Sequence, residues 1–91
     1  MSRSVLLINR ASGGNERGLI ASQVCDVVHQ AFVDDGHQMT ALVIDPWKIE
    51  DEIKDAMASQ PDSIIIGGGD GSVSTAARLL GGTGIALGIL P

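Results

Sequence analysis

The chain has 91 residues, of which 44% are hydrophobic, and six Lys and Arg stand against eleven Asp and Glu. A chain of this length forms one small domain, and its net charge of −5 disfavours general attraction to nucleic acid or to anionic membranes. The single cysteine, Cys25, excludes an intrachain disulfide and a cysteine metal cluster, and no apolar run is long enough for a signal or a membrane span. We therefore expect a soluble cytoplasmic protein.

Extended and helical patterns alternate along the chain. Short apolar runs predict strands, and apolar residues at three- and four-residue spacing predict helices. In chain order, the predicted elements are a strand at 5–8, a helix at 16–34, a strand at 39–44, a helix after Asp45-Pro46, a strand at 63–66, a helix at 72–80 and a strand at 85–90.

Two of the helices have a predicted core face. The first helix presents an apolar stripe, and Gly36 is suited to end it. That stripe consists of Ile20, Val24, Val27, Val28 and Ala31, with Cys25 near it. The second helix presents Ile49, Ile53 and Met57, and the acidic run 50–52 forms its solvated first turn.

The segment from Ile64 to Ser72 carries the strongest functional signal, because an apolar strand there runs into the sequence Gly-Gly-Gly-Asp-Gly-Ser. Glycine lets the backbone turn sharply and come close to another molecule. Asp70 and Ser72 are helix-initiating residues, and the open end of a helix presents N–H groups and a positive dipole to phosphate. The alternative is a plain strand-to-helix turn, yet four glycines favour phosphate contact.

A second glycine turn follows the first predicted strand, at Ser12-Gly13-Gly14, and Asn9 stands at the end of that strand. We expect Asn9 to bond either the ligand or the facing loop, and Arg10 and Arg17 either to pair with phosphate or to be solvated or ion-paired. The predicted nucleotide-binding residues are Asn9, Arg10, Ala11, Ser12, Gly13, Gly14, Gly68, Gly69, Asp70, Gly71, Ser72, Val73 and Ser74.

Four strands separated by three helices predict an α/β fold with a parallel sheet and right-handed crossovers, in three layers α/β/α. If both glycine loops grip one ligand, the first and third strands are neighbours. We therefore predict the strand order 2-1-3-4, with the site beyond the carboxyl ends of the strands. The alternative order 3-2-1-4 holds the two loops one strand further apart.

Three motifs resemble one enzyme family. Gly68-Gly69-Asp70-Gly71-Ser72 is similar to the GGDG-[TS] signature of the diacylglycerol kinase, sphingosine kinase and NAD kinase superfamily, and phosphofructokinases have a related loop. Residues 9–14 resemble the N-P-x-S-G loop of lipid kinases, and residues 87–91 resemble the strand that there runs into a G-T-x-N-D segment. The resemblance covers nearly all of the chain and implies a Rossmann-like, phosphofructokinase-like fold.

The resemblance implies the N-terminal nucleotide-binding part, residues 1–91, of a diacylglycerol kinase catalytic domain, cut before the G-T-x-N-D motif. ATP would donate its γ-phosphate to a hydroxyl of a diacylglycerol-like lipid. The family's aspartate at Asp70 implies a catalytic role there, holding Mg²⁺ directly or through water or orienting the acceptor, whereas a structural Asp70 would cap the following helix. A missing C-terminal β domain would supply the general base and the lipid pocket, so this part alone would be inactive.

The same expectation includes self-association through the exposed edge of the last strand, and a full-length protein that is cytoplasmic or peripheral at the inner membrane surface. Departures from the family pattern are Arg10 in place of proline, and Ser74 and Thr75 where many lipid kinases have Asn-Glu. The alternative functions are an NAD kinase-like phosphotransferase and a non-catalytic nucleotide-binding module. Trp47 either packs under the second helix or lies near the adenine, and His29 and His37 are expected to be surface or helix-end residues.

Overall fold

The computed structural model describes residues 2–10 and 17–90, without the side chains of residues 17–20 and Asp70. Its elements are β1 (Arg3–Asn9), α1 (Arg17–Asp34), β2 (Gln38–Ile44), the 3₁₀ helix η1 (Pro46–Lys48), α2 (Ile49–Ala58), β3 (Ser63–Gly67), α3 (Asp70–Leu80) and β4 (Ala86–Leu90). Every predicted strand and helix is therefore present, with ends that differ by at most about two residues, as is usual for such boundaries. No described helix combines the length and the apolar character that crossing a membrane requires.

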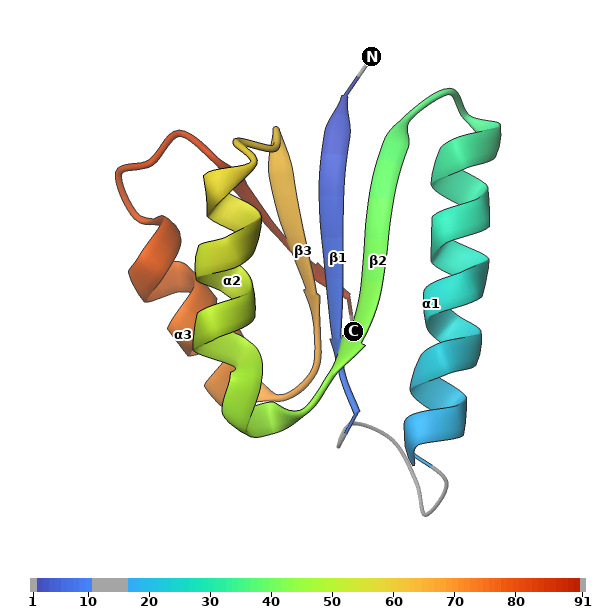
Figure 1. The fold of residues 1–91 in the computed structure, drawn as a ribbon, viewed down its shortest axis with the longest axis horizontal. Helices are drawn as coiled ribbons and strands as arrows, with labels where there is room; N and C mark the ends of the chain where they lie inside the picture. Colours follow the sequence, from blue (N-terminus) through green and yellow to red (C-terminus); the bar gives the residue numbers. More distant parts are fainter. Residues whose placement is uncertain (1, 11–16, 91) are drawn as a thin grey trace.

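The strands form one parallel sheet in the order β2-β1-β3-β4, which confirms the predicted α/β fold and the predicted order. Helix α1 covers one face of the sheet, and α2 and α3 cover the other (Figure 1). Asn9 is in register with Ile44, and Ile8 with Gly67. Because all strands run the same way, the turns that follow β1, β2 and β3 leave the sheet at one edge, here called the carboxyl edge.

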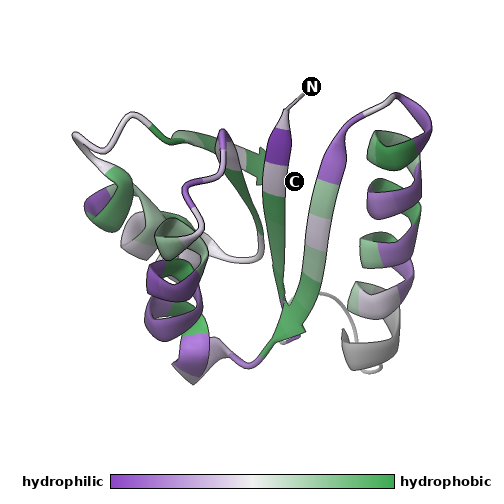
Figure 2. Ribbon diagram, turned by 45° about the horizontal axis from the view of Figure 1, so that its top comes forward, coloured by the Kyte–Doolittle hydropathy of each residue, from purple (hydrophilic) through white to green (hydrophobic). Residues whose placement is uncertain are grey.

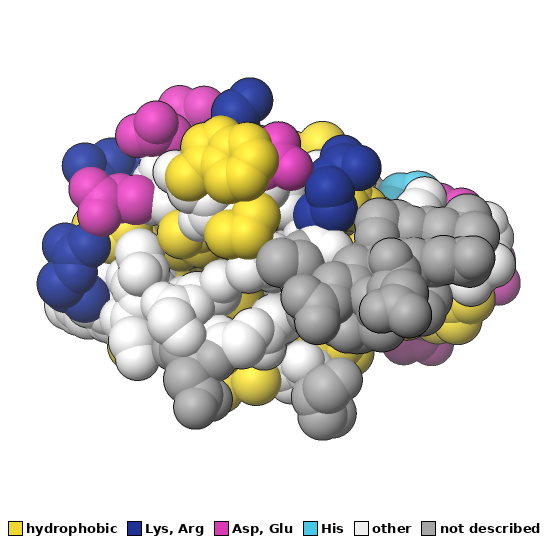
Figure 3. Space-filling view, turned by 90° about the horizontal axis from the view of Figure 1, so that it is seen from below, with side chains coloured by type: hydrophobic (Ala, Val, Ile, Leu, Met, Phe, Trp, Pro, Cys, Tyr) yellow, Lys and Arg dark blue, Asp and Glu magenta, His cyan; other side chains and the backbone are white. Residues whose placement is uncertain are grey.

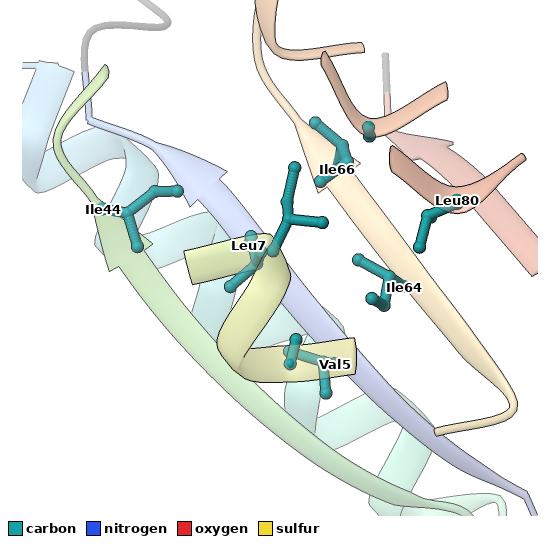
Figure 4. Packing of buried hydrophobic residues seen from close by; sticks show 9 residues of the cluster. Val5, Leu7, Ile44, Ile64, Ile66 and Leu80 are labelled. Atoms are coloured by element: carbon teal, nitrogen blue, oxygen red, sulfur yellow. The ribbon is translucent and has the colours of Figure 1, made fainter. Parts of the chain in front are cut away.

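The residues of β1 alternate between two cores. Val5 and Leu7 pack on the α2 and α3 side, and Figure 4 shows them pointing the same way as Ile44, Ile64 and Ile66. Leu6 and Ile8 pack on the α1 side. A strand that is buried on both faces reads as a continuous apolar run, and Figure 2 shows this run in the middle layer, with the hydrophilic residues concentrated in the helices.

The predicted core stripe of α1 is wrong at most of its positions. Val27 is 70% exposed, and Val24 and Ala31 also lie at the surface. The residues that face the sheet are instead Ala21 and Cys25, which are buried, with Val28 and Phe32 partly buried beside them. The small side chains of Ala21 and Cys25 let the helix approach the large residues of β1 and β2. Ile20 has no described side chain, so its place in the stripe lies outside the described residues.

His29 covers part of the free edge of β2. The Gln38 N–H donates to the Ser2 carbonyl, and the Ile44 carbonyl accepts from the Arg10 N–H, so these residues of β2 face β1. Because successive residues of a strand point their backbone groups to opposite sides, the Met39 carbonyl faces away from the sheet. The His29 Nε2–H donates to that carbonyl at 3.0 Å, which gives an otherwise unpaired edge group a partner.

An ion-pair network joins α2 to α3. The Glu50 carboxylate accepts from the Arg78 guanidinium at 2.6 Å and pairs with the Lys54 ammonium at 3.1 Å. These interactions, first the hydrogen bond from Lys54 and then that from Arg78, lower the pKa of Glu50. The acidic first turn of α2, predicted to be solvated, therefore also links the two helices that cover one face of the sheet.

Replacing Ile53 by Ala is expected to lower the free energy of unfolding by about 2–4 kcal/mol, because this side chain is fully buried and leaves a cavity. The matched control is Ile89→Ala, the same deletion at a side chain that is 58% exposed, which is expected to cost less than about 1 kcal/mol. Urea denaturation of both variants measures the difference. Equal losses would contradict the assignment of the core.

The stabilisation that Glu50 provides is expected to depend on pH. Its pKa in the folded state lies below its unfolded value near 4.5, so the contribution is present above that pH and is lost as the pH falls through the folded-state pKa. Wild type should therefore exceed Glu50→Gln in thermal stability at neutral pH, and the gap should close in acid. In a background that already lacks Lys54 and Arg78, the pH-dependent gap is expected to shrink to what the helix dipole alone provides, and a gap of unchanged size would contradict the network.

Candidate functional site

The candidate site begins where β1 and β3 end side by side. The Asn9 side-chain Nδ2–H donates to the Ser72 Oγ at 3.1 Å, which joins the end of β1 to the first turn of α3. The sequence left two partners open for Asn9, the ligand and the facing loop. In the structure, Asn9 bonds the facing loop. Ser72 is buried, so this bond fixes the two chain segments relative to each other at the carboxyl edge.

The glycines of the turn after β3 fall into two groups. A Cβ on Gly68 would lie 2.8 Å from the Asn9 Cβ, and one on Gly67 would lie 3.2 Å from the Ile8 Cγ1, so packing against β1 requires both positions to be small. A Cβ on Gly69 or on Gly71 would meet no atom of the described residues within 4 Å. The described residues therefore impose no packing need for glycine at Gly69 and Gly71, and they leave the space beside both positions open to another molecule.

Helix α3 begins two residues earlier than predicted. Gly69, with extended backbone, is its N-cap, and the N–H groups of Ser72 and Val73 both donate to the Gly69 carbonyl. Asp70 is therefore the first helical residue and not the cap, and Ser72 lies within the first turn. The early N–H groups of a helix have no intrahelical acceptor, so those of Asp70 and Gly71 lie at the open end of α3, next to the unfilled space.

The remaining predicted residues of this turn have local roles. Val73 is partly buried against the core, and Ser74 is exposed. Thr75 donates its hydroxyl to the Gly71 carbonyl at 2.9 Å. Among the side chains that the structure describes, which leave out Asp70, no group of three or more His, Cys, Asp or Glu is arranged to hold a metal ion.

The first loop is tied to the end of β2. The Arg10 Nε lies 3.2 Å from the Asp45 Oδ1, and the Arg10 N–H donates to the Ile44 carbonyl at 2.7 Å. Arg10 is thus ion-paired, which is one of the two alternatives predicted for it. Ala11, Ser12, Gly13 and Gly14 and the side chain of Arg17 lie outside the described residues.

Trp47 does not pack under α2, contrary to one of its two predicted placements. Its side chain is 77% exposed in η1, because α2 begins only at Ile49 and buries Ile53 and Ala56 instead. Figure 3 views the molecule from the carboxyl edge and shows hydrophobic side chains at the surface among acidic and basic ones. The spacing of residues in the sequence could not predict that Trp47 is exposed, since Trp side chains are on average highly buried.

Replacing Gly68 by Ala is expected to destabilise the fold by about 1–3 kcal/mol, because the added Cβ would press on Asn9. Gly69→Ala is the matched control: it adds the same methyl group to open space and is expected to change the free energy of unfolding by less than about 1 kcal/mol. Denaturation of both variants, with the amide shift of Asn9 as a local reporter, measures this. Equal effects would contradict the division of the glycines into packing and open positions.

No curated protein matches the chain significantly. The sequence profile of the diacylglycerol kinase catalytic domain matches residues 3–91. The match begins at the start of β1 and includes the segment between β1 and α1 and the turn after β3. Since it spans nearly the whole chain, this protein belongs to the diacylglycerol kinase catalytic domain family, whose members are lipid kinase-type phosphotransferases.

Proposed function

We propose that this chain is the ATP-binding part of a kinase that transfers the γ-phosphate of ATP to a hydroxyl of a diacylglycerol-like lipid. The observation that carries the proposal is the open space beside Gly69 and Gly71, at the start of α3, where the fold itself has no need of glycine. Family membership supports phosphoryl transfer, and the choice of ATP and of the lipid is the proposed part.

The residues of the turn would bind phosphate mainly through their backbone. The N–H groups of Asp70 and Gly71 lie at the N-terminal end of α3, where they would donate to an incoming anion. Glycine, which has no Cβ, lets the oxygens of the phosphate come close to the backbone. The hydrogen bond between Asn9 and Ser72 holds the turn in place before the ligand arrives, so little further ordering is needed on binding. Backbone binding suits a chain whose net charge is −5, because it needs no cluster of Lys or Arg.

Asp70 is the proposed catalytic residue, and it would hold Mg²⁺ directly or through water or orient the acceptor hydroxyl. The position of Asp70 suits this role, because it is the first residue of α3 and stands between Gly69 and Gly71, beside the open space. When bound, Mg²⁺ supplies charge neutralisation on the phosphates. Ser72 and Asn9 position the turn, and Ser74, which is exposed, is a proposed phosphate contact. The role proposed for residues 1–91 is to bind and orient the nucleotide donor.

A titration of the 91-residue chain with Mg·ATP, followed by amide NMR, tests the nucleotide site. Shifts are expected at residues 9–14 and 68–74, and they should be lost in Gly69→Asp, which adds a carboxylate to the open space and repels phosphate. Gly69→Ala is the control for the fold. Shifts confined to other residues, or unchanged binding by Gly69→Asp, would refute the site. The acceptor is tested with the full-length gene product, which should phosphorylate diacylglycerol and not NAD.

A further inference from the structure

Trp47 is the most exposed of the large hydrophobic side chains that the structure describes, at 77%. It belongs to neither core cluster, so the fold gains no packing from it. Single exposed hydrophobic residues are common on protein surfaces. Three further observations indicate that Trp47 binds a ligand. They concern the rigidity of the turn that carries it, its location at the carboxyl edge, and the lack of another aromatic side chain there.

The turn that carries Trp47 is held firmly. Pro46 is the first residue of η1, where its ring presets the backbone angle, and the Lys48 N–H donates to the Asp45 carbonyl at 2.9 Å. Arg10 pairs with the Asp45 carboxylate, and its N–H bonds the last residue of β2. The position of η1 is therefore tied to the chain that leaves β1, which is one side of the candidate phosphate site.

The place of Trp47 suits the base of a bound nucleotide. Strands of a sheet lie about 4.8 Å apart, so the end of β2 lies about 10 Å along the carboxyl edge from the end of β3. A nucleotide with its phosphates at Gly69 and Gly71 that extends toward β2 passes the Asn9 end of β1 and reaches η1. A nucleotide that extended the other way along the edge would reach β4, which ends in the aliphatic side chain of Leu90 and has no aromatic ring there.

The sequence contains one Phe, one Trp and no Tyr. Phe32 is partly buried in the α1 core with its ring 5.8 Å from that of His37, so it cannot serve the carboxyl edge. His29 is held at the edge of β2 by its bond to the Met39 carbonyl. Trp47 is thus the one Phe, Tyr or Trp side chain of this sequence that can lie flat against a base at the site.

We infer that Trp47 stacks on the base of the nucleotide whose phosphates bind at Gly69 and Gly71. This inference rests on the proposed function. A neutral, planar base suits this surface, because charges of both signs surround Trp47: residues 50–52 are acidic, and Lys48 follows Trp47 in η1. Stacking on an aromatic side chain tolerates any base, so the contact adds affinity for nucleotides over inorganic polyphosphate without selecting strongly among bases.

Trp47 is its own reporter, because a chain with one Trp and no Tyr emits tryptophan fluorescence from this residue alone. ATP is expected to quench the emission on binding, whereas tripolyphosphate, which has no base, should bind the same turn and leave the emission unchanged. Trp47→Ala is expected to weaken ATP binding by about 5- to 150-fold. Its tripolyphosphate affinity should change less than about twofold, and Trp47→Phe should recover most of the ATP affinity. Amide NMR measures both affinities without relying on catalysis.

Other results would overturn the inference, each in a recognisable way. Equal weakening of ATP and tripolyphosphate by Trp47→Ala would mean that the residue acts on the turn and not on the base. ATP binding that leaves the emission unchanged and resists Trp47→Ala would remove the stacking contact but leave the phosphate site standing. A blue-shifted emission with phosphatidylglycerol vesicles and none with ATP would assign Trp47 to a membrane surface. Failure of wild type to bind either phosphate compound would refute the proposed site and the stacking contact together.

Discussion

The pairing of β1 with β3 is the constraint on which the rest of the structure depends. It places β1 in the interior of the sheet, where residues 4–8 are buried from both sides. It also forces α2 to cross over β1 on its way from β2 to β3, which supplies the cover for Val5 and Leu7. At the carboxyl edge the same pairing brings Asn9 against Gly68, so the small residue there and the bond from Asn9 to Ser72 follow from strand order.

Helices α2 and α3 both begin at the carboxyl edge, as α1 does, and the first turns of α2 and α3 differ in charge. The first turn of α2 contains Glu50, Asp51 and Glu52, so its own carboxylates already interact with the positive end of the helix dipole. The first turn of α3 contains Asp70 followed by Gly71 and Ser72. Under the proposed function, an anion that approaches this edge would be repelled by the three carboxylates of α2 and would meet backbone N–H groups and a single carboxylate, that of Asp70, at α3. An acidic protein can in this way direct a polyanion to one turn.

Much of this arrangement follows from local patterns in the sequence. Apolar runs and glycine turns located every strand, and the assumption that two glycine loops serve one ligand gave the strand order. The face of α1 could not be obtained in this way, because the helix has two apolar stripes and periodicity alone does not tell which is buried. The different roles of the glycines in the turn after β3 could not be predicted from the sequence either. Gly68 and Gly69 are identical letters in one run, and only the neighbouring strand distinguishes a packing position from an open one.

The hydrogen bond from His29 to the Met39 carbonyl makes the two borders of the sheet unequal. A strand added beside β2 would have to displace the imidazole before it could bond that carbonyl, and α1 would have to yield with it. At β4, no described side chain makes a comparable bond to a backbone carbonyl of the strand. A strand added to this sheet would therefore meet less resistance beside β4 than beside β2, where a side chain of the covering helix already occupies a backbone acceptor.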